Sequence, residues 1–463
     1  MSGGGLVIRN AEVDGRGGQD VRIADGRIVA IGKVPASADE VDARGGALIP
    51  GLADHHIHLF ALAARQASVG LEDATTAAEV RARIERAAAG RAPGAWIRAV
   101  GYHESMAGEL DRTALDQLAP RHPLRVQHQT GALWVLNTAA LEAVDARSGP
   151  PSVERGADGA PTGRIWRGDA WLRARIGAEP PPLSPIGREL ASRGVSSFTD
   201  ASVTTDAAAA ASLADAHRRG ELPQRLTLMS GGALAPPADG AYAVGPVKVL
   251  LDDHALPPLD EFTEKIATAR RWGRGVAVHC VTAAELALTL AAFETAGARP
   301  GDRIEHGGVI PEAAIGQIRI LGLTVVTQPA FVRERGDRYL AEVDPAEQPD
   351  LYRCASLRAA GVPVAASSDA PYATPDPWIG VAAAVSRNTR GGQVLGGGER
   401  IGPAEALAMY LGAAASPAAP RRVVVGADAD LCLLAAPIQT VLSEPSADLV
   451  AATVIAGRVV HGV

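Results

Sequence analysis

Short apolar runs, each ending at polar residues, recur through the middle of the chain. They have the length of buried strands, and amphipathic stretches of helical length separate most of them. Alternating strands and helices predict a parallel sheet, and eight such units over this length predict a (β/α)8 TIM-type barrel. The eight runs are GLADHH, GVSSFTD, RLTLMS, PVKVLL, GVAVHC, DRIEH, LTVVTQ and VPVAASSD. The clearest helical stretches are Leu259–Trp272, Ala283–Ala296, Pro311–Leu321 and Leu351–Ala360.

The two ends of the chain follow a different pattern, in which β-branched runs alternate with Gly and Asp turns. Residues 1–51 contain GLVIRNAEV, DVRIADGRIVAIG and GGALIP, and residues 411–463 contain DADLCLLAAP and VAATVIAGRVVHGV. Such patterns are typical of strands. We therefore expect both ends to build one small β-sandwich domain, with the barrel formed by residues 52–410.

A long segment, at about residues 59–193, separates the first two predicted barrel strands. It contains four of the six tryptophans: Trp96, Trp134, Trp166 and Trp171. Segments that follow barrel strands emerge on the active-site face, and loops of this length are usually functional. The insertion is therefore predicted to form a lid and a wall of the substrate site.

Composition and charge narrow the classes of function. The 463 residues are 47% hydrophobic, enough for a sizeable core, and the net charge of −7 with no basic stripe argues against nucleic-acid binding. The three cysteines are far apart and odd in number, which fits a reducing compartment. Neither a signal peptide nor a membrane-spanning run is evident. We expect a cytoplasmic protein that acts on a small molecule and could form a homo-oligomer.

Residues of metal-ligand type stand at several predicted strand ends. His56 and His58, two residues apart in an extended chain, can point the same way and meet one metal ion. Each such residue alone could be structural, for example a buried histidine or an aspartate that caps a helix. Together, at the ends where barrel enzymes carry out chemistry, they predict a metal site. The others are Lys248, His279, His306 and Asp369, in the fourth, fifth, sixth and eighth predicted strands.

Lys248 interrupts the run PVKVLL, which is expected to be buried. A bare buried ammonium is costly, and an ammonium is not a metal ligand. Carboxylation by CO2 would convert the side chain into an anionic carbamate whose two oxygens could bridge two cations. An ion-paired strand lysine is the alternative.

The segments PGLADHHIHL, VKVLLDD, VAVHC, RIEHG and AASSDAP resemble the signature segments of the amidohydrolase superfamily of metal-dependent hydrolases. The resemblance extends over nearly the whole chain, including PTGRIW, TGALWVLNTAAL and GADADLCLL. The greatest similarity is to the branch, amidohydrolase family 3, that includes N-substituted formamide deformylases. These motifs are specific for the superfamily and poorly specific for substrate.

The resemblance implies a binuclear metal centre. The more buried ion would be bound by His56, His58 and Asp369. His279 and His306 would bind the second ion. Zinc is the expected metal because imidazole and carboxylate ligands suit it, although manganese, iron or cobalt could substitute.

The resemblance also implies that a carboxylated Lys248 bridges the two ions and that Asp369 acts as general acid/base. The implied reaction is hydrolysis of a C–N bond by a metal-activated hydroxide. The substrate classes would be an amide, an N-formyl or N-acyl amine, or a cyclic amide. No serine or cysteine nucleophile is needed.

The sequence departs from the family pattern in the insertion. Relatives often have a glycine–histidine pair where TGALWVLN places Ala132, and Arg167 stands where a glutamate is expected after PTG. These departures leave the substrate open. The candidate substrate contacts, each of which could equally be a surface or packing residue, are His103, Trp134, Trp166, Arg167, Gln328, Arg333 and Tyr372.

Three alternatives remain open. A hydrolytic deaminase on a related barrel uses one metal and carries a glutamate three residues after a strand-end histidine, where this chain has Thr282. An esterase or lactonase could use the same site, because an activated water attacks either kind of carbonyl. A non-catalytic barrel relative would usually have lost ligands, whereas here the set is intact.

Overall fold

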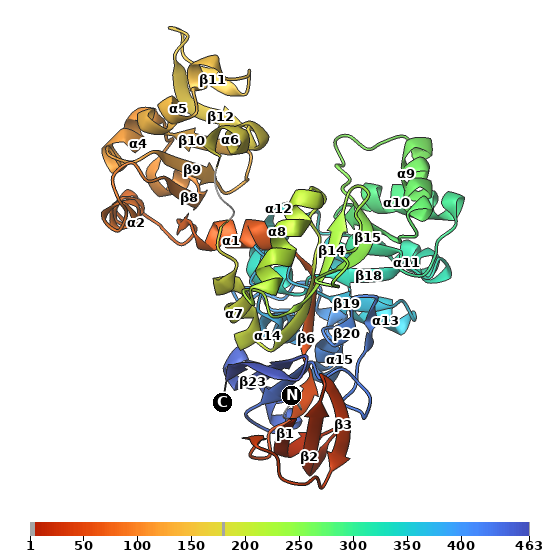
Figure 1. The fold of residues 1–463 in the computed structure, drawn as a ribbon. Helices are drawn as coiled ribbons and strands as arrows, with labels where there is room; N and C mark the ends of the chain where they lie inside the picture. The colour runs from red at the N-terminus through yellow and green to blue at the C-terminus, as the bar shows by residue number, and fades with distance from the viewer. Residues whose placement is uncertain (1–4, 178–180, 463) are drawn as a thin grey trace. The chain divides into compact units, whose positions relative to one another are not determined.

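The computed structural model describes residues 5–177 and 181–462 (Figure 1). It divides into two compact units, Met1–Leu59 with Leu183–Val463, and Phe60–Pro182. The first unit contains the barrel and the terminal sheets, and the second is the insertion. Residues Leu183–Arg193, which the sequence analysis assigns to the insertion, group with the barrel unit.

Eight parallel strands form the barrel, in the spatial order β19-β18-β17-β16-β15-β14-β13-β6. Most of their side chains are buried on both faces, as parallel strands require when helices cover the sheet. The barrel is nearly closed, because Asp369 N donates to His56 O at 2.8 Å and His58 N donates to Ala370 O at 2.9 Å. The strands are β6 (Leu52–Ile57), β13 (Val195–Asp200), β14 (Arg225–Ser230), β15 (Ala243–Val249), β16 (Val276–Cys280), β17 (Arg303–His306), β18 (Thr324–Thr327) and β19 (Val364–Ala366).

Helices are interleaved with these strands, which confirms the predicted (β/α)8 fold. The capping box of Thr282 and Glu285 shows why α10 begins at Ala283: each side chain bonds the other's backbone N–H. The helices of this unit are α7 (Ser184–Ser192), α8 (Ala207–Arg218), α9 (Leu259–Arg271), α10 (Ala283–Ala296), α11 (Glu312–Ile320), α12 (Ala330–Glu342), α13 (Ala355–Ala359), α14 (Pro377–Ser386), α15 (Pro403–Ala408) and α16 (Ile438–Ser443).

The prediction of a helix over Leu351–Ala360 is wrong in its first half, because α13 contains only Ala355–Ala359. Tyr352 adopts a φ of 46°, a left-handed conformation that does not continue a right-handed helix. Arg353 instead donates to Ile310 O at 2.8 Å and to Glu399 Oε1 at 3.0 Å. Tertiary contacts therefore override the helical pattern of this stretch.

The two ends of the chain build a small β-sandwich, as predicted. Strand β5 from the N-terminal part pairs with β22 from the C-terminal part, and residues of both sheets share one apolar core. Figure 1 shows these strands in red and blue. The first sheet is β3 (Arg27–Gly32), β2 (Arg16–Ala24), β1 (Leu6–Val13) and β4 (Asp39–Asp42). The second is β24 (Arg458–Gly462), β23 (Val450–Ile455), β22 (Leu431–Leu434) and β5 (Leu48–Pro50), and β20 (Gly412–Ala413) pairs with β21 (Ser416–Pro420).

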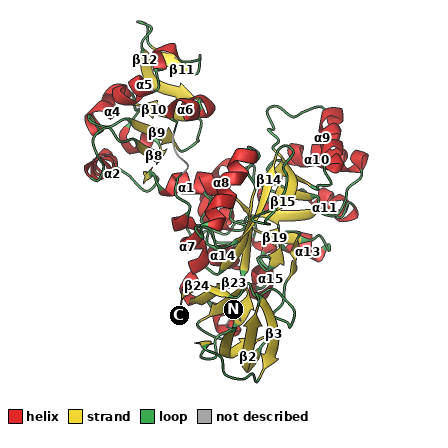
Figure 2. Cartoon of the chain, viewed as in Figure 1, coloured by secondary structure: helices red, strands yellow, loops and turns green. Residues whose placement is uncertain are grey.

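The insertion has a mixed sheet and a core of its own, which the sequence analysis did not predict. Figure 2 shows its strands in yellow among red helices. The strands are β11 (Val153–Arg155), β12 (Pro161–Trp166), β10 (Leu133–Leu136), β9 (Leu124–His128), β8 (Ile97–Tyr102) and β7 (Val69–Gly70), in spatial order. The helices are α1 (Leu59–Gln66), α2 (Ala77–Ala89), α3 (Glu104–Ala107), α4 (Arg112–Leu118), α5 (Thr138–Ala143) and α6 (Asp169–Ile176). Its role as a lid stays a prediction.

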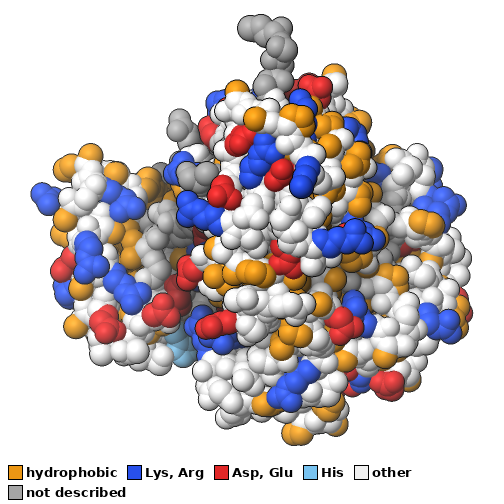
Figure 3. Space-filling view, turned by 90° about the horizontal axis from the view of Figure 1, so that it is seen from below, with side chains coloured by type: hydrophobic (Ala, Val, Ile, Leu, Met, Phe, Trp, Pro, Cys, Tyr) orange, Lys and Arg blue, Asp and Glu red, His pale blue; other side chains and the backbone are white. Residues whose placement is uncertain are grey.

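The exposed surface is mixed in charge. Figure 3 shows Lys and Arg interspersed with Asp and Glu over the face that it draws. Among the residues described, no helix combines the length and the apolar character needed to cross a membrane.

Candidate functional site

The barrel brings the six predicted ligand residues to one place. His56 lies near the end of β6 and His58 directly follows it, and their rings lie 5.2 Å apart between centroids. The ring of His306 lies 4.8 Å from that of His56 and 4.5 Å from that of His279. Lys248 Nζ lies 3.5 Å from His56 Nε2. The carboxyl ends of parallel strands meet at one face of a barrel, so residues far apart in sequence converge there.

Asp369 follows β19 and faces the histidines. Its Oδ1 lies 3.1 Å from Nε2 of His58 and 3.4 Å from Nε2 of His56. This oxygen is buried, yet it accepts no hydrogen bond from the residues that the structure describes. One donor atom each from His56, His306 and Asp369 lies within 4.8 Å of the others. Imidazole nitrogens gathered around an unsatisfied carboxylate oxygen fit a divalent metal ion.

Burial disfavours the charged form of three of the clustered histidines. It lowers the pKa of His279 to about 4 and holds those of His56 and His306 well below their usual value. Burial also lowers the pKa of the Lys248 ammonium. Metals bind the neutral imidazole, so this apolar setting suits metal binding.

Two residues of the cluster have unusual backbone conformations. His306 has a φ of 72° and Asp369 a φ of 55°, in the left-handed region that non-glycine residues rarely adopt. Such conformations cost on the order of 1–3 kcal/mol and concentrate at functional sites. The surrounding fold therefore holds both side chains in place at some cost to stability.

Glu305 orients the ring of His56 by bonding its Nδ1. One carboxylate oxygen bonds Nδ1 of His56, and the other accepts from Nε of Arg303. Arg303 also donates to His55 O at 2.9 Å. A carboxylate at Nδ1 fixes the tautomer that leaves Nε2 free for a metal. Glu305 was not among the predicted site residues, although a charged residue in a run expected to be buried, DRIEH, needs a partner and so offers a usable signal.

Other polar residues contact His306 and His58 or anchor the segment that carries Asp369. Gln328 lies within 2.9 Å of His306 Nδ1 through Oε1, and its Nε2 donates to Ser367 at 2.9 Å. Ser202 lies 3.2 Å from Nδ1 of His58. Asp54 accepts from Ser368 N at 3.0 Å and so joins β6 to the segment that carries Asp369. Burial raises the pKa of Asp54 to about 6.

Replacing Glu305 by glutamine is expected to weaken metal binding by roughly 10–100-fold, because the amide holds His56 less firmly. Titration of the metal-free protein with Zn2+ measures the change. Glu399 provides a matched control: it is also buried and paired with an arginine, Arg353, but contacts no histidine in the described residues. Unchanged affinity in E305Q, or an equal loss in E399Q, would contradict the orienting role.

The candidate substrate contacts in the barrel unit differ in setting. Gln328 is fully buried, and its side chain bonds His306 and Ser367. Tyr372 is 56% exposed, and its ring lies 5.9 Å from that of His58, edge to face. Arg333 is exposed on α12. Of these, Tyr372 has the position best suited to contact a molecule at the cluster.

The remaining candidates belong to the insertion. Trp134 is buried in a core of that unit and donates from Nε1 to Asp169 at 2.8 Å. Trp166 is exposed and donates to Glu154 at 3.3 Å. Arg167 has a φ of 51° and donates its backbone N–H to Ala132 O at 2.7 Å. His103 caps α3.

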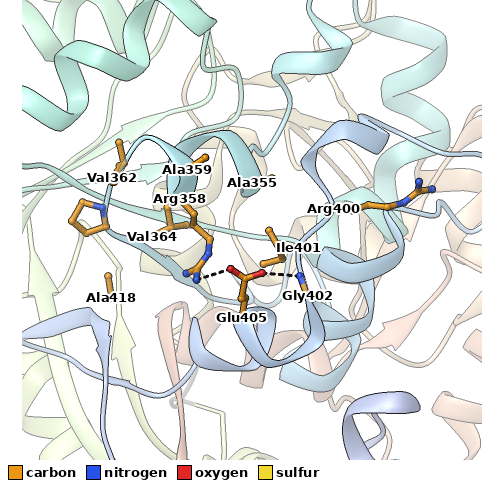
Figure 4. Close-up of a pocket in the computed structure, with 12 residues that line it drawn as sticks. Ala355, Arg358, Ala359, Val362, Val364, Arg400, Ile401, Gly402, Glu405 and Ala418 are labelled. Atoms are coloured by element: carbon orange, nitrogen blue, oxygen red, sulfur yellow. Dashed lines mark hydrogen bonds and ion pairs between the residues drawn. The ribbon is translucent and has the colours of Figure 1, made fainter. Parts of the chain in front are cut away.

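A cavity of about 610 Å³ lies away from the histidine cluster (Figure 4). Val364 at the start of β19 lines it, whereas Asp369 follows the other end of that strand. Arg358 and Glu405 form an ion pair in its wall at 3.3 Å. The cavity thus lies at the amino end of a barrel strand, whereas the histidine cluster lies at the carboxyl ends, where barrel enzymes bind their substrates.

Known proteins resemble this chain over most of its length. The chain is 26% identical to an N-substituted formamide deformylase of Arthrobacter pascens, over 88% of each chain. It is 22% identical to the putative amidohydrolase YtcJ of Bacillus subtilis, over 76% of this chain and 75% of that one. The fold matches an uncharacterized metal-dependent hydrolase from Pyrococcus horikoshii with a TM-score of 0.76 and 20% identity, over 93% of this chain and 97% of that one.

These similarities confirm the family that the sequence motifs indicate. The sequence model of the amidohydrolase family matches residues 39–461, which include all eight barrel strands and the insertion but not β1, β2 and β3 of the sandwich. The buried cluster of His56, His306 and Asp369 supplies a candidate metal site at the catalytic end of the barrel. The chain belongs to the amidohydrolase family (family 3) and is a metal-dependent hydrolase.

Proposed function

We propose that the protein hydrolyses the C–N bond of an N-substituted formamide or a related amide at a binuclear metal centre. The observation that carries this proposal is the convergence of four histidines, one lysine and one aspartate at the carboxyl ends of the barrel strands. A bound divalent ion supplies Lewis acidity there, polarising a carbonyl oxygen and lowering the pKa of water towards neutrality.

His56, His58 and Asp369 would hold one ion, and His279 and His306 would hold the other. Two observations support this division: Asp369 Oδ1 approaches Nε2 of both His56 and His58, and the rings of His279 and His306 lie 4.5 Å apart. Burial also leaves the imidazole of His279 uncharged and available as a ligand. Zinc suits the donor set.

Lys248 would bridge the two ions as a carbamate. Burial favours its neutral amine, which is the form that reacts with CO2. The Nζ lone pair forms a bond to the carbon of CO2, one proton leaves the nitrogen, and an anionic carbamate results. A carbamate on Lys248 would supply anionic oxygen ligands, whereas an ammonium 3.5 Å from the His56 imidazole would compete with a cation.

Asp369 would move the proton. Its Oδ1 faces His56 and His58, and its Oδ2 lies 3.9 Å from Nδ1 of His306. The carboxylate takes a proton from the attacking water and gives it to the leaving nitrogen, so that the C–N bond breaks with release of an amine and a carboxylic acid. Tyr372, half-exposed beside His58, would contact the substrate near the reacting carbonyl.

The formamide class is supported by the 26% identity to a deformylase over 88% of both chains. Purified protein loaded with Zn2+ and bicarbonate tests it, with release of formate and amine followed from N-alkyl and N-aryl formamides. Matching acetamides and formate esters serve as controls. We expect the formamides to be hydrolysed fastest. Faster hydrolysis of the esters, or release of ammonia from aminated heterocycles with no formamide turnover, would overturn the proposal.

Thr282 argues against the deaminase alternative. It occupies the place where a deaminase would carry its glutamate, and its side chain is engaged in capping α10. No carboxylate is therefore available at that position to act on a ring nitrogen.

A further inference from the structure

We propose that the insertion carries a metal site of its own, formed by His103, Glu104 and His128. One donor atom from each of these side chains lies within 4.8 Å of the others. All three residues belong to the compact unit Phe60–Pro182, so the site needs nothing from the barrel. Two imidazoles and one carboxylate are a ligand set suited to zinc and similar divalent ions.

Two adjacent parallel strands bring the three residues together. Tyr102, the last residue of β8, is paired with His128, the last residue of β9. Gln129 N donates to Tyr102 O at 2.8 Å and extends this pairing beyond the strands. His103 and Glu104 follow β8 directly, so both histidines emerge at the same edge of the sheet.

The ε nitrogens of both histidines are directed at one carboxylate. Nε2 of His128 lies 2.9 Å from Oε2 of Glu104, and Nε2 of His103 lies 3.9 Å from Oε1. The two rings lie 5.6 Å apart between centroids. The carboxylate thus faces both imidazoles through its two oxygens.

The δ nitrogens of both histidines have hydroxyl partners. Nδ1 of His103 lies 2.8 Å from Oγ of Ser105, and Nδ1 of His128 lies 2.8 Å from Oγ1 of Thr130. Backbone N–H groups of Ser105 and Thr130 also donate to these nitrogens, at 3.1 and 3.3 Å. Without an ion, each Nδ1 accepts and each Nε2 therefore carries the ring proton. Binding of an ion at Nε2 requires this proton to move to Nδ1, so each ring gives up its backbone hydrogen bond and donates to the neighbouring hydroxyl instead.

The site is open to solvent. Glu104 is 56% exposed and His128 16% exposed, measured over their side chains, so an ion can enter without unfolding the unit. Three protein ligands leave a fourth tetrahedral position for water or another small ligand, as at exchangeable rather than structural zinc sites. The alternative is a carboxylate that only accepts hydrogen bonds from two histidines and binds no ion.

Equilibrium dialysis of the full-length protein against Zn2+, followed by elemental analysis, tests the proposal. We expect H128Q to bind about one zinc ion per chain fewer than the unaltered protein, because three ligands define a single site. H254A is the matched control: His254 also lies beside an acidic residue, with Nδ1 3.6 Å from Asp253, but belongs to the barrel unit and is 89% exposed.

A loss in H128Q with no change in H254A supports the site. Equal zinc content in H128Q and the unaltered protein, or the same loss in H254A, overturns it. E104Q provides a second variant should H128Q fail to fold, because Glu104 is exposed and its replacement leaves the core of the unit unchanged. The experiment measures a difference in zinc content between variants. This difference does not depend on how many ions the barrel centre binds or on whether the protein acts on formamides.

Discussion

Replacing Asp369 by asparagine is expected to lower turnover by roughly 10²–10⁴-fold, the usual contribution of a general acid/base. Asparagine has nearly the same shape and keeps an oxygen towards His56 and His58, so the protein should fold and retain most of its metal. It cannot take a proton from water at neutral pH. Steady-state turnover and metal content, measured on the same preparation, give the two quantities together.

Asp302 supplies the control for this substitution. It is also buried, but it precedes β17 at the opposite end of the barrel strands, where it pairs with Arg270 and accepts from Val276 N at 2.8 Å. D302N should lower the free energy of unfolding and leave turnover per folded molecule near normal. Near-normal turnover in D369N, or loss of all metal, would show that Asp369 is not the proton-transfer group.

Replacing Lys248 by alanine is expected to reduce the barrel centre from about two ions to about one or fewer and to abolish most turnover, because two cations held close together then lack the anion that bridges them. Elemental analysis measures the ion content. Incubation of the unaltered protein with ¹³C-bicarbonate should add a carbamate resonance that is absent from K248A.

Lys265 is the matched control for the lysine substitution. It lies exposed on α9, and K265A should keep both the resonance and the metal. A K248A protein with unchanged metal content, or a carbamate resonance that persists in it, would reduce Lys248 to a structural lysine.

The barrel could be predicted from the sequence because its strands are buried on both faces and read as continuous apolar runs. Each ligand residue stood at the end of such a run, and the carboxyl ends of barrel strands share one face. His56, Lys248 and Asp369 could therefore be expected to meet, although nearly two hundred residues separate His56 from Lys248.

Other features could not be predicted because long-range contacts decide them. The run DRIEH marks Glu305 as a buried charge that needs a partner, but its partner, a histidine 249 positions away, is decided by the fold and not by local sequence. Tyr352 leaves the helical conformation through contacts that a local pattern does not contain. The insertion combines short strands with polar residues, such as Arg98 and Arg125, which stack over Trp134 at 5.4 and 5.0 Å and so hide the apolar signal of a sheet.

Anomalous diffraction from crystals grown with Zn2+ and bicarbonate, recorded on both sides of the zinc absorption edge, tests the central claim most directly. The proposed centre predicts two peaks about 3.5–4 Å apart among His56, His58, Lys248, His279, His306 and Asp369, the spacing usual in two-metal sites. It also predicts density for a carbamate between them. A single peak beside His56 and Asp369, or none within the cluster, would contradict the bridged binuclear centre.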